Sequence, residues 1–199
     1  MTPRTAFLIV WGSILLGLAA LVLLVVAVKK LRAWLLARAA ARLGLAVNRA
    51  PGPFTMEEAE HNTLLRLFNA EARGPSLCGR IDGIEIVVFH RHFVTKSGFH
   101  TATEYADETV AAFRCFPGKE MEFQLGRGAQ LRTQQPETTA RILTPEKLQL
   151  LERLQQRERW TLWAGGEWLL VYRPERTVGV GKLCAFLEQA RAIAAAIKE

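Results

Sequence analysis

His90 and His92 are the residues whose type and spacing come nearest to a chemical site. They lie two positions apart in an apolar run, IEIVVFHRHFV, that has the composition of a β-strand. Side chains at positions i and i+2 of a strand point to the same face, so both imidazoles would lie on one side of a sheet. With His100 or Glu108 as a further ligand they could bind a metal ion, since zinc takes three or four converging N, O or S ligands. One hypothesis is therefore a metal-dependent hydrolase that uses His90 and His92.

The other residue types that perform catalysis lack a supporting pattern. Two histidines on one strand face are also common as ordinary sheet residues with hydrogen-bonded partners. Cys78, Cys115 and Cys184 are widely spaced and form no CxxC pair, which leaves no zinc or redox motif of that kind. No G-x-S-x-G nucleophile elbow is present. We therefore assign no catalytic residue, expect no cofactor, and favour a non-catalytic protein over an enzyme.

The elements around these histidines follow a long apolar segment near the N-terminus. The stretch Ala6–Val28 holds 23 residues without a charge. As a helix it would span roughly 35 Å, which is enough to cross a hydrocarbon core of about 30 Å with some tilt. A cleaved signal peptide has a shorter apolar core, and its positive charge precedes that core. The stretch therefore predicts a single transmembrane helix.

The basic residues are concentrated beside this stretch. The chain has 199 residues and a net charge of +7, but residues 1–43 contain six Lys and Arg and no Asp or Glu, so the remainder is close to neutral. A nearly neutral domain has no electrostatic footprint for nucleic acid, and we exclude that partner. Five of the six basic residues follow the apolar stretch, which by the positive-inside rule places the N-terminus outside and the domain in the cytoplasm. The predicted anchor flank consists of Lys29, Lys30, Arg32, Trp34, Arg38 and Arg42.

Two details of this region leave alternatives open. Leu31, Trp34, Leu35 and Arg38 recur at helical spacing, so this stripe lies either among lipid headgroups or against the domain. Ser13 and Gly17 have the small-xxx-small spacing that permits close helix–helix approach and homo-oligomers. The expected partners are thus the membrane, a protein, or a second copy of the chain.

The domain organisation predicted from the sequence is a transmembrane helix with a basic helical extension over 1–43, a linker over 44–54, and an α+β domain over 55–199. Pro51-Gly52-Pro53 marks the linker, and Thr55 and Thr144 are placed as helix N-caps. Asp82-Gly83 predicts a hairpin that pairs Ile81 with Ile84 and Arg80 with Glu85.

Further strands and helices complete this antiparallel domain with two β-hairpin groups. A third strand within 104–116 would set His90 opposite Glu108 and Arg91 opposite Asp107. Residues 121–125 alternate as a short strand, and 126–138 read as a loop. A second hairpin around Gly165-Gly166 would set Trp163 opposite Trp168. The closing helix over 181–197 would bury Leu183, Phe186, Leu187, Ala190, Ile193, Ala194 and Ile197.

The order of these features resembles an uncharacterised family of bacterial single-pass membrane proteins with a small cytoplasmic α+β domain. The matching pieces are the ARLGL segment, the spaced glycines from Leu77 to Phe89, Thr109-Val110, Leu143-Thr144-Pro145-Glu146, and WLLVYR before a final helix. The resemblance implies an inner-membrane location and brings no activity with it. We therefore expect a membrane-anchored interaction domain that binds a protein partner or the membrane surface. The alternatives are the metal-dependent hydrolase and a pleckstrin-like lipid-binding module, in which strands precede a closing helix.

Overall fold

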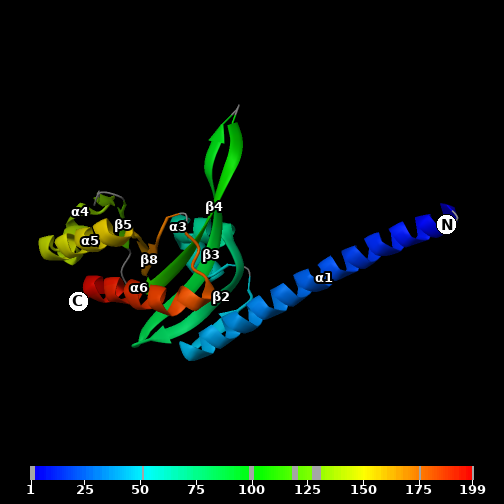
Figure 1. The fold of residues 1–199 in the computed structure, drawn as a ribbon. Helices are drawn as coiled ribbons and strands as arrows, with labels where there is room; N and C mark the ends of the chain where they lie inside the picture. Colours follow the sequence, from blue (N-terminus) through cyan, green and yellow to red (C-terminus); the bar gives the residue numbers. More distant parts are fainter. Residues whose placement is uncertain are drawn as a thin grey trace. The chain divides into compact units, whose positions relative to one another are not determined.

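The computed structural model describes residues 3–50, 52–98, 101–117, 121–126, 131–174 and 176–198 (Figure 1). At residues 3–10, 12–14, 32, 96–98, 101–103 and 154–158 it describes the backbone alone. The chain divides into two compact units, Met1–Arg38 and Ala39–Glu199.

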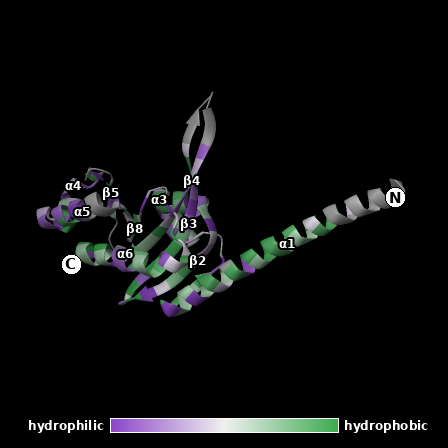
Figure 2. Cartoon of the chain, viewed as in Figure 1, coloured by the Kyte–Doolittle hydropathy of each residue, from purple (hydrophilic) through white to green (hydrophobic). Residues whose placement is uncertain are grey.

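The described residues of the first unit belong to one helix, whose last four residues lie in the second unit. Helix α1 runs over Pro3–Arg42, and it is apolar on every side along its middle (Figure 2). Among the residues that the structure describes, no helix is both long and apolar enough to cross a membrane. The predicted span Ala6–Val28 falls partly on residues 6–10 and 12–14, whose side chains lie outside the described part, and so does Ser13 of the predicted self-association pair. The large apolar side chains exposed along α1 include Leu15, Leu16, Leu18, Leu21, Val22, Leu23, Leu24, Val25, Val26 and Val28.

The second unit is built on one antiparallel sheet. Within the described residues this sheet has eight strands in the order β1-β2-β3-β4-β8-β7-β5-β6. The α+β class is confirmed, and the two predicted hairpin groups join into one sheet because β4 pairs with β8. No pairing between β1 and β6 closes the described sheet into a barrel, as a pleckstrin-like module would need. The strands are β1 Leu45–Asn48, β2 Ala72–Ile81, β3 Ile84–Gly98, β4 Thr101–Arg114, β5 Met121–Leu125, β6 Leu131–Thr133, β7 Thr161–Gly166 and β8 Trp168–Tyr172.

Helices cover both faces of this sheet. Helix α3 packs on β3, where Leu65 and Phe68 join a core with Phe89 and Tyr172. Helix α6 contacts β4 and β8 and buries the apolar face predicted for it. Since alternate strand residues such as Phe113 are buried on the opposite side from Phe89, α6 covers that second face. The helices of this unit are α2 Met56–His61, α3 Thr63–Glu71, α4 Pro136–Ile142, α5 Pro145–Glu158, the 3₁₀ helix η2 Val180–Lys182, and α6 Leu183–Lys198.

The first hairpin has the predicted register, and the next pair of strands is shifted by one residue. Ile81 pairs with Ile84 across Asp82-Gly83, whose positive φ values of 50° and 76° suit the turn that this dipeptide predicts. Between β3 and β4, however, Arg91 pairs with Glu108, and His90 and His92 pair with Thr109 and Asp107. The predicted pairs of His90 with Glu108 and Arg91 with Asp107 are therefore wrong.

The turn of the second hairpin lies one residue later in the chain than predicted. Gly165 pairs with Trp168 and Trp163 with Leu170, so the turn lies at Gly166-Glu167 and the predicted Trp163–Trp168 pair is wrong. A Cβ atom on Gly165 would lie 2.5 Å from Cδ2 of Leu64. Gly165 is therefore a strand residue that lets helix α3 approach the sheet closely, whereas only Gly166 belongs to the turn.

Three short elements lie where the sequence suggests irregular chain. Strand β1 falls within the predicted linker 44–54. Strand β6 falls within the predicted loop 126–138, and helix α4 begins in that loop and ends after it. By contrast, the helix starts at Thr55 and Thr144 and the strand over 121–125 are confirmed.

Candidate functional site

The two histidines lie on the same side of strand β3, as predicted, and each has a partner on β4. Nδ1 of His90 lies 2.9 Å from Oγ1 of Thr109, a hydroxyl that also accepts a hydrogen bond of 2.8 Å from the backbone N–H of Val178. Nδ1 of His92 lies 2.7 Å from Oδ1 of Asp107, and its ring stacks on Tyr105 with centroids 4.9 Å apart. The two imidazoles thus make separate cross-strand contacts.

Glu108, one of the two further ligands proposed for these histidines, does not join them in the described structure. Within the described residues no three His, Cys, Asp or Glu side chains are placed to hold a metal ion together. Glu108 interacts with Arg91 on the opposite face of the sheet, because the register differs by one residue from the predicted one. His100 lies outside the described residues. A metal site at His90 and His92 stays a prediction.

Arg91 is buried and links strands β3, β4 and β8 to helix α3. The sequence predicts for it only a pairing with Asp107. Arg91 is 7% exposed and donates from Nε to Glu108, which is fully buried, and from Nη1 to Oε2 of Glu71 over 3.2 Å. Its guanidinium carbon lies over three aromatic rings, with centroid distances of 4.3 Å to Phe68, 4.3 Å to Phe93 and 5.1 Å to Tyr172. Burial of Tyr172 in this cluster raises the pKa of its phenol to about 12. The sequence contains a signal for this buried position, because Arg91 alternates with Phe89 and Phe93 and so shares their face of the strand.

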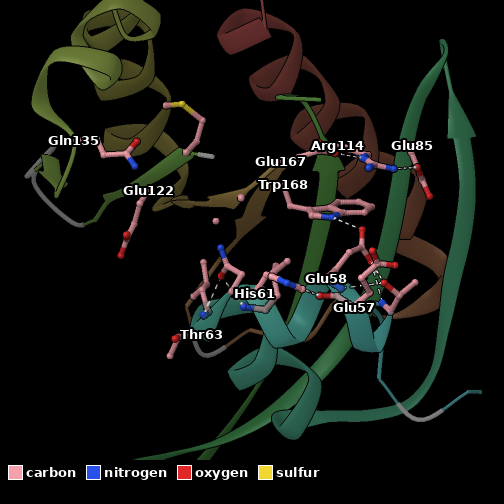
Figure 3. Close-up of a pocket in the computed structure, with 17 residues that line it drawn as sticks. Glu57, Glu58, His61, Thr63, Glu85, Arg114, Glu122, Gln135, Glu167 and Trp168 are labelled. Carbon is pink, nitrogen blue, oxygen red and sulfur yellow. Dashed lines mark hydrogen bonds and ion pairs between the residues drawn. The ribbon is translucent and has the colours of Figure 1, made fainter. Parts of the chain in front are cut away.

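A groove of about 840 Å³ lies between the α2–α3 corner, strand β5 and the turn from β7 to β8 (Figure 3). We call it the glutamate groove, because five glutamates line it. Figure 3 shows Glu122 and Gln135 on one side and the side chains of α2 on another. The side chains and backbone that line it include Glu57, Glu58, Glu85, Glu122, Glu167, His61, Arg114, Gly165, Gly166 and Trp168.

At one end of the groove a single arginine holds two carboxylates. Arg114 donates from Nε to Oε2 of Glu167 over 2.5 Å and from Nη1 to Oε2 of Glu85 over 3.4 Å. The hydrogen bond that Arg114 donates to Glu167 raises the pKa of Arg114 above its ordinary value; burial opposes this rise, and the hydrogen bond to Glu85 adds to it. These groups come from β3, β4 and the β7–β8 turn, so the ion pairs tie three strands together.

The glutamates of α2 have different roles. Glu58 completes a capping box, since its side chain accepts from the Thr55 backbone N–H over 2.9 Å while the Thr55 hydroxyl accepts from the Glu58 N–H. The other oxygen of Glu58 accepts a hydrogen bond of 2.9 Å from Nε1 of Trp168 on β8. The sequence predicts only a solvated first turn for this helix, and Glu57 is exposed as such a turn requires.

The cysteines are free thiols with little access to solvent. Cys115 is buried, and burial raises the pKa of its thiol to about 12. At neutral pH this thiol is protonated and unreactive, because the thiolate is the nucleophilic form. Cys78 and Cys184 are half-buried.

The predicted anchor flank lies on the exposed surface of α1. Lys29, Lys30, Trp34, Arg38 and Arg42 are exposed, and the side chain of Arg32 lies outside the described part. The guanidinium carbon of Arg38 lies 5.3 Å from the ring centroid of Trp34, one helical turn before it.

Comparison of the chain with known proteins found no matching family model, no matching curated protein and no matching solved structure.

Proposed function

We propose that the chain is a single-pass membrane protein, anchored through Ala6–Val28, whose α+β domain binds a protein partner. The observation that carries the anchor is the exposure of large apolar side chains all around α1 between Leu15 and Val28. A helix that is apolar on every side is unfavourable in water and needs an apolar environment. The uncharged sequence before Leu15 extends this surface to a length that suits a bilayer.

The distribution of charge supports the orientation and location of this protein. Arg4 precedes the apolar stretch and five basic residues follow it closely, which favours an outside N-terminus and a cytoplasmic domain. The resemblance to bacterial single-pass proteins favours the inner membrane of a bacterium.

The glutamate groove supports a binding role for the domain. It is a hollow of about 840 Å³ whose lining includes residues of α2, α3, β5 and the β7–β8 turn. Arg114 and Trp168 engage Glu85, Glu167 and Glu58 in contacts that hold the fold. These three carboxylates are therefore engaged within the domain, whereas Glu57 and Glu122 of the same lining are exposed. A partner segment that carries Lys or Arg would complement them.

Membrane extraction of the full chain tests the anchor. The wild-type chain should stay with membranes washed in alkaline carbonate. Leu16→Arg with Leu18→Arg should shift it to the wash or to aggregates, because each Arg at a span centre costs about 3 kcal/mol. The matched control places two arginines at exposed leucines of the domain, Leu67→Arg with Leu150→Arg, and should behave as wild type. Release of the wild-type chain by carbonate would overturn the anchor.

Site-directed photo-crosslinking tests the binding role. A photoreactive residue at Glu122 or Gln135, on the rim of the groove, should give one discrete crosslinked protein in native membranes. The same residue at the exposed positions Glu188 or Ala192 of α6 should not give that product. Identical products from both sets, or none from the groove, would argue against a partner at the groove.

The metal-dependent alternative has its own discriminator. Elemental analysis of the purified chain should be compared with that of the variant His90→Ala with His92→Ala. Stoichiometric metal that the variant loses would replace the binding proposal with the hydrolase.

A further inference from the structure

We infer that the exposed face of α1 just after the predicted span binds the anionic phospholipid headgroups of the bilayer. We call the exposed residues of this stretch the basic collar and define it by Lys29, Lys30, Leu31, Trp34, Leu35, Arg38 and Arg42. The inference rests on the proposed anchor, which brings the collar to the bilayer surface, and it adds the class of lipid that the protein selects.

Helical geometry gathers five of the seven collar residues on one side of α1, while Lys30 and Lys29 lie about 100° and 160° around the axis from Leu31. Leu31, Trp34, Leu35, Arg38 and Arg42 are spaced i, i+3, i+4, i+7 and i+11, and at about 100° per residue they fall within one stripe. Leu31 and Trp34 are 56% and 54% exposed. The stripe is thus apolar at its start, aromatic in the middle and basic at its end.

Two buried residues of the same helix lie at the edge of this stripe and opposite it. Ala39 and Ala40 are buried at the start of the second unit. By helical geometry they lie roughly 80° and 180° around the axis from Leu31. The side chains of the stripe, Leu31, Trp34, Leu35, Arg38 and Arg42, are all exposed.

The charge of the collar identifies the kind of surface that complements it. The first acidic residue of the chain is Glu57, so the five basic residues between 29 and 42 have no carboxylate near them in sequence. Basic residues beside an apolar span gain affinity from anionic lipid, at about fivefold for each residue near the surface. Arginine also matches phosphate with a planar pair of donors.

The tryptophan places the contact at the depth of the headgroups. An indole ring favours the membrane interface because its body is apolar and its N–H is polar. Arg38 lies over the ring of Trp34 at 5.3 Å, so the cation and the interfacial aromatic ring occupy the same level of the helix. Leu31 continues the apolar surface of the span toward that level.

Lipid selection by the full chain tests the inference. The protein is purified in mixed micelles with equal amounts of phosphatidylglycerol and phosphatidylcholine, and the lipids it retains are quantified by mass spectrometry. The wild-type chain should retain phosphatidylglycerol over phosphatidylcholine by about tenfold or more. Lys29→Gln with Lys30→Gln and Arg38→Gln should lower that preference by about fivefold or more, with Arg32 and Arg42 still in place.

A matched variant separates the collar from net charge. Arg66→Gln, Arg80→Gln and Arg132→Gln remove the same charge from exposed positions of the domain and should keep the wild-type preference. Equal retention of both lipids by the wild-type chain would overturn the inference, as would a loss of preference in the matched variant equal to that in the collar variant. A chain that resists carbonate but shows no lipid preference contradicts the collar alone, whereas a chain released by carbonate contradicts the anchor as well.

Discussion

Arg91 and Glu108 face one another across strands β3 and β4, and the domain interior encloses both. The pair is extended by Glu71 at the end of α3 and by the rings of Phe68 and Tyr172. It therefore connects the helix on one face of the sheet to three neighbouring strands. A buried charge is costly without its partner, so this contact makes the register of β3 and β4 important for stability.

Removal of one member of this pair should destabilise the domain strongly. Arg91→Ala leaves Glu108 buried without its main cation and removes the packing on Phe68, which should lower the free energy of unfolding by about 3–5 kcal/mol. Urea unfolding of the full chain in mild detergent measures this change. Arg66→Ala, at an exposed position, should change it by less than about 0.5 kcal/mol.

Replacement of both members should be tolerated better. Arg91→Met with Glu108→Leu removes both charges together and should restore most of the loss, since apolar residues of similar volume often replace buried ion pairs without cost. A double variant as unstable as Arg91→Ala would show that packing, not the unpaired charge, dominates.

The sequence predicts a turn better than it predicts the length of a loop. Asp82-Gly83 is a specific turn signal, and its hairpin has the predicted register. Between β3 and β4 no such dipeptide marks the centre, and both faces of the strands are buried near Phe89, so no alternation distinguishes the two registers. The one-residue difference placed Glu108 beside Arg91 and away from His90.

Substitution of Gly52, in the segment before α2, should destabilise the domain for two reasons. Gly52 has a φ of 88°, and a Cβ atom there would lie 2.8 Å from Oδ1 of Asn69. That amide both accepts from the Phe54 N–H and donates to the Phe54 carbonyl, so it cannot move freely. Gly52→Ala should lower the free energy of unfolding by about 2–4 kcal/mol, the sum of backbone strain and overpacking.

Gly74 provides the matched control for backbone strain alone. Its φ is 73°, and a Cβ atom there would meet nothing within 4 Å. Gly74→Ala should therefore cost about 1–2 kcal/mol. Equal losses in the two alanine variants would show that the contact with Asn69 adds nothing.

Stability should fall in alkaline solution because two buried groups lose their protons. Burial raises the pKa of Tyr172 from 10.0 to about 12 and that of Cys115 from 9.0 to about 12. Because the unfolded chain loses these protons first, the stabilisation is complete below pH 9 and is lost progressively between pH 9 and 12. Tyr172 alone should account for up to about 3 kcal/mol.

Urea unfolding at pH 8, 9.5 and 11 measures this loss. Tyr172→Phe with Cys115→Ala should flatten the dependence on pH, although the unfolding free energy at pH 8 also changes. Tyr105→Phe, at a tyrosine that is 59% exposed, should keep the wild-type slope. A slope that is the same in all three proteins would place the alkaline loss elsewhere.

The glutamate groove could not be predicted from the sequence, because six separate segments build it. Its lining extends from Thr55 to Trp168, and the order of strands in the sheet brings β5 beside β7. Long-range pairing of this kind has no local signal in one sequence. Local signals did identify the Thr55 cap and the buried face of α6.

The two neighbouring glutamates of α2 offer the sharpest test of how the groove is held. Glu58→Ala removes the reciprocal half of the capping box and leaves Nε1 of Trp168 without its carboxylate partner. The free energy of unfolding should fall by about 2–3 kcal/mol. About 1 kcal/mol of this comes from the lost cap, and the rest comes from the indole N–H that loses its acceptor. Glu57→Ala, with the same charge change on the same helical turn, should cost less than about 1 kcal/mol.

A double-mutant cycle with Trp168→Phe separates the two contributions of Glu58. The phenyl ring keeps an aromatic group in the core and removes the N–H donor. Its smaller volume costs packing in both Glu58 backgrounds, so this loss cancels in the cycle. If the indole bond matters, the loss from Glu58→Ala should shrink by about 1 kcal/mol or more in the Trp168→Phe background, because the donor is then gone in both proteins. Additive losses would mean that Glu58 acts through the cap alone, and the side of the groove formed by α2 would then be fixed to β8 by packing rather than by this hydrogen bond.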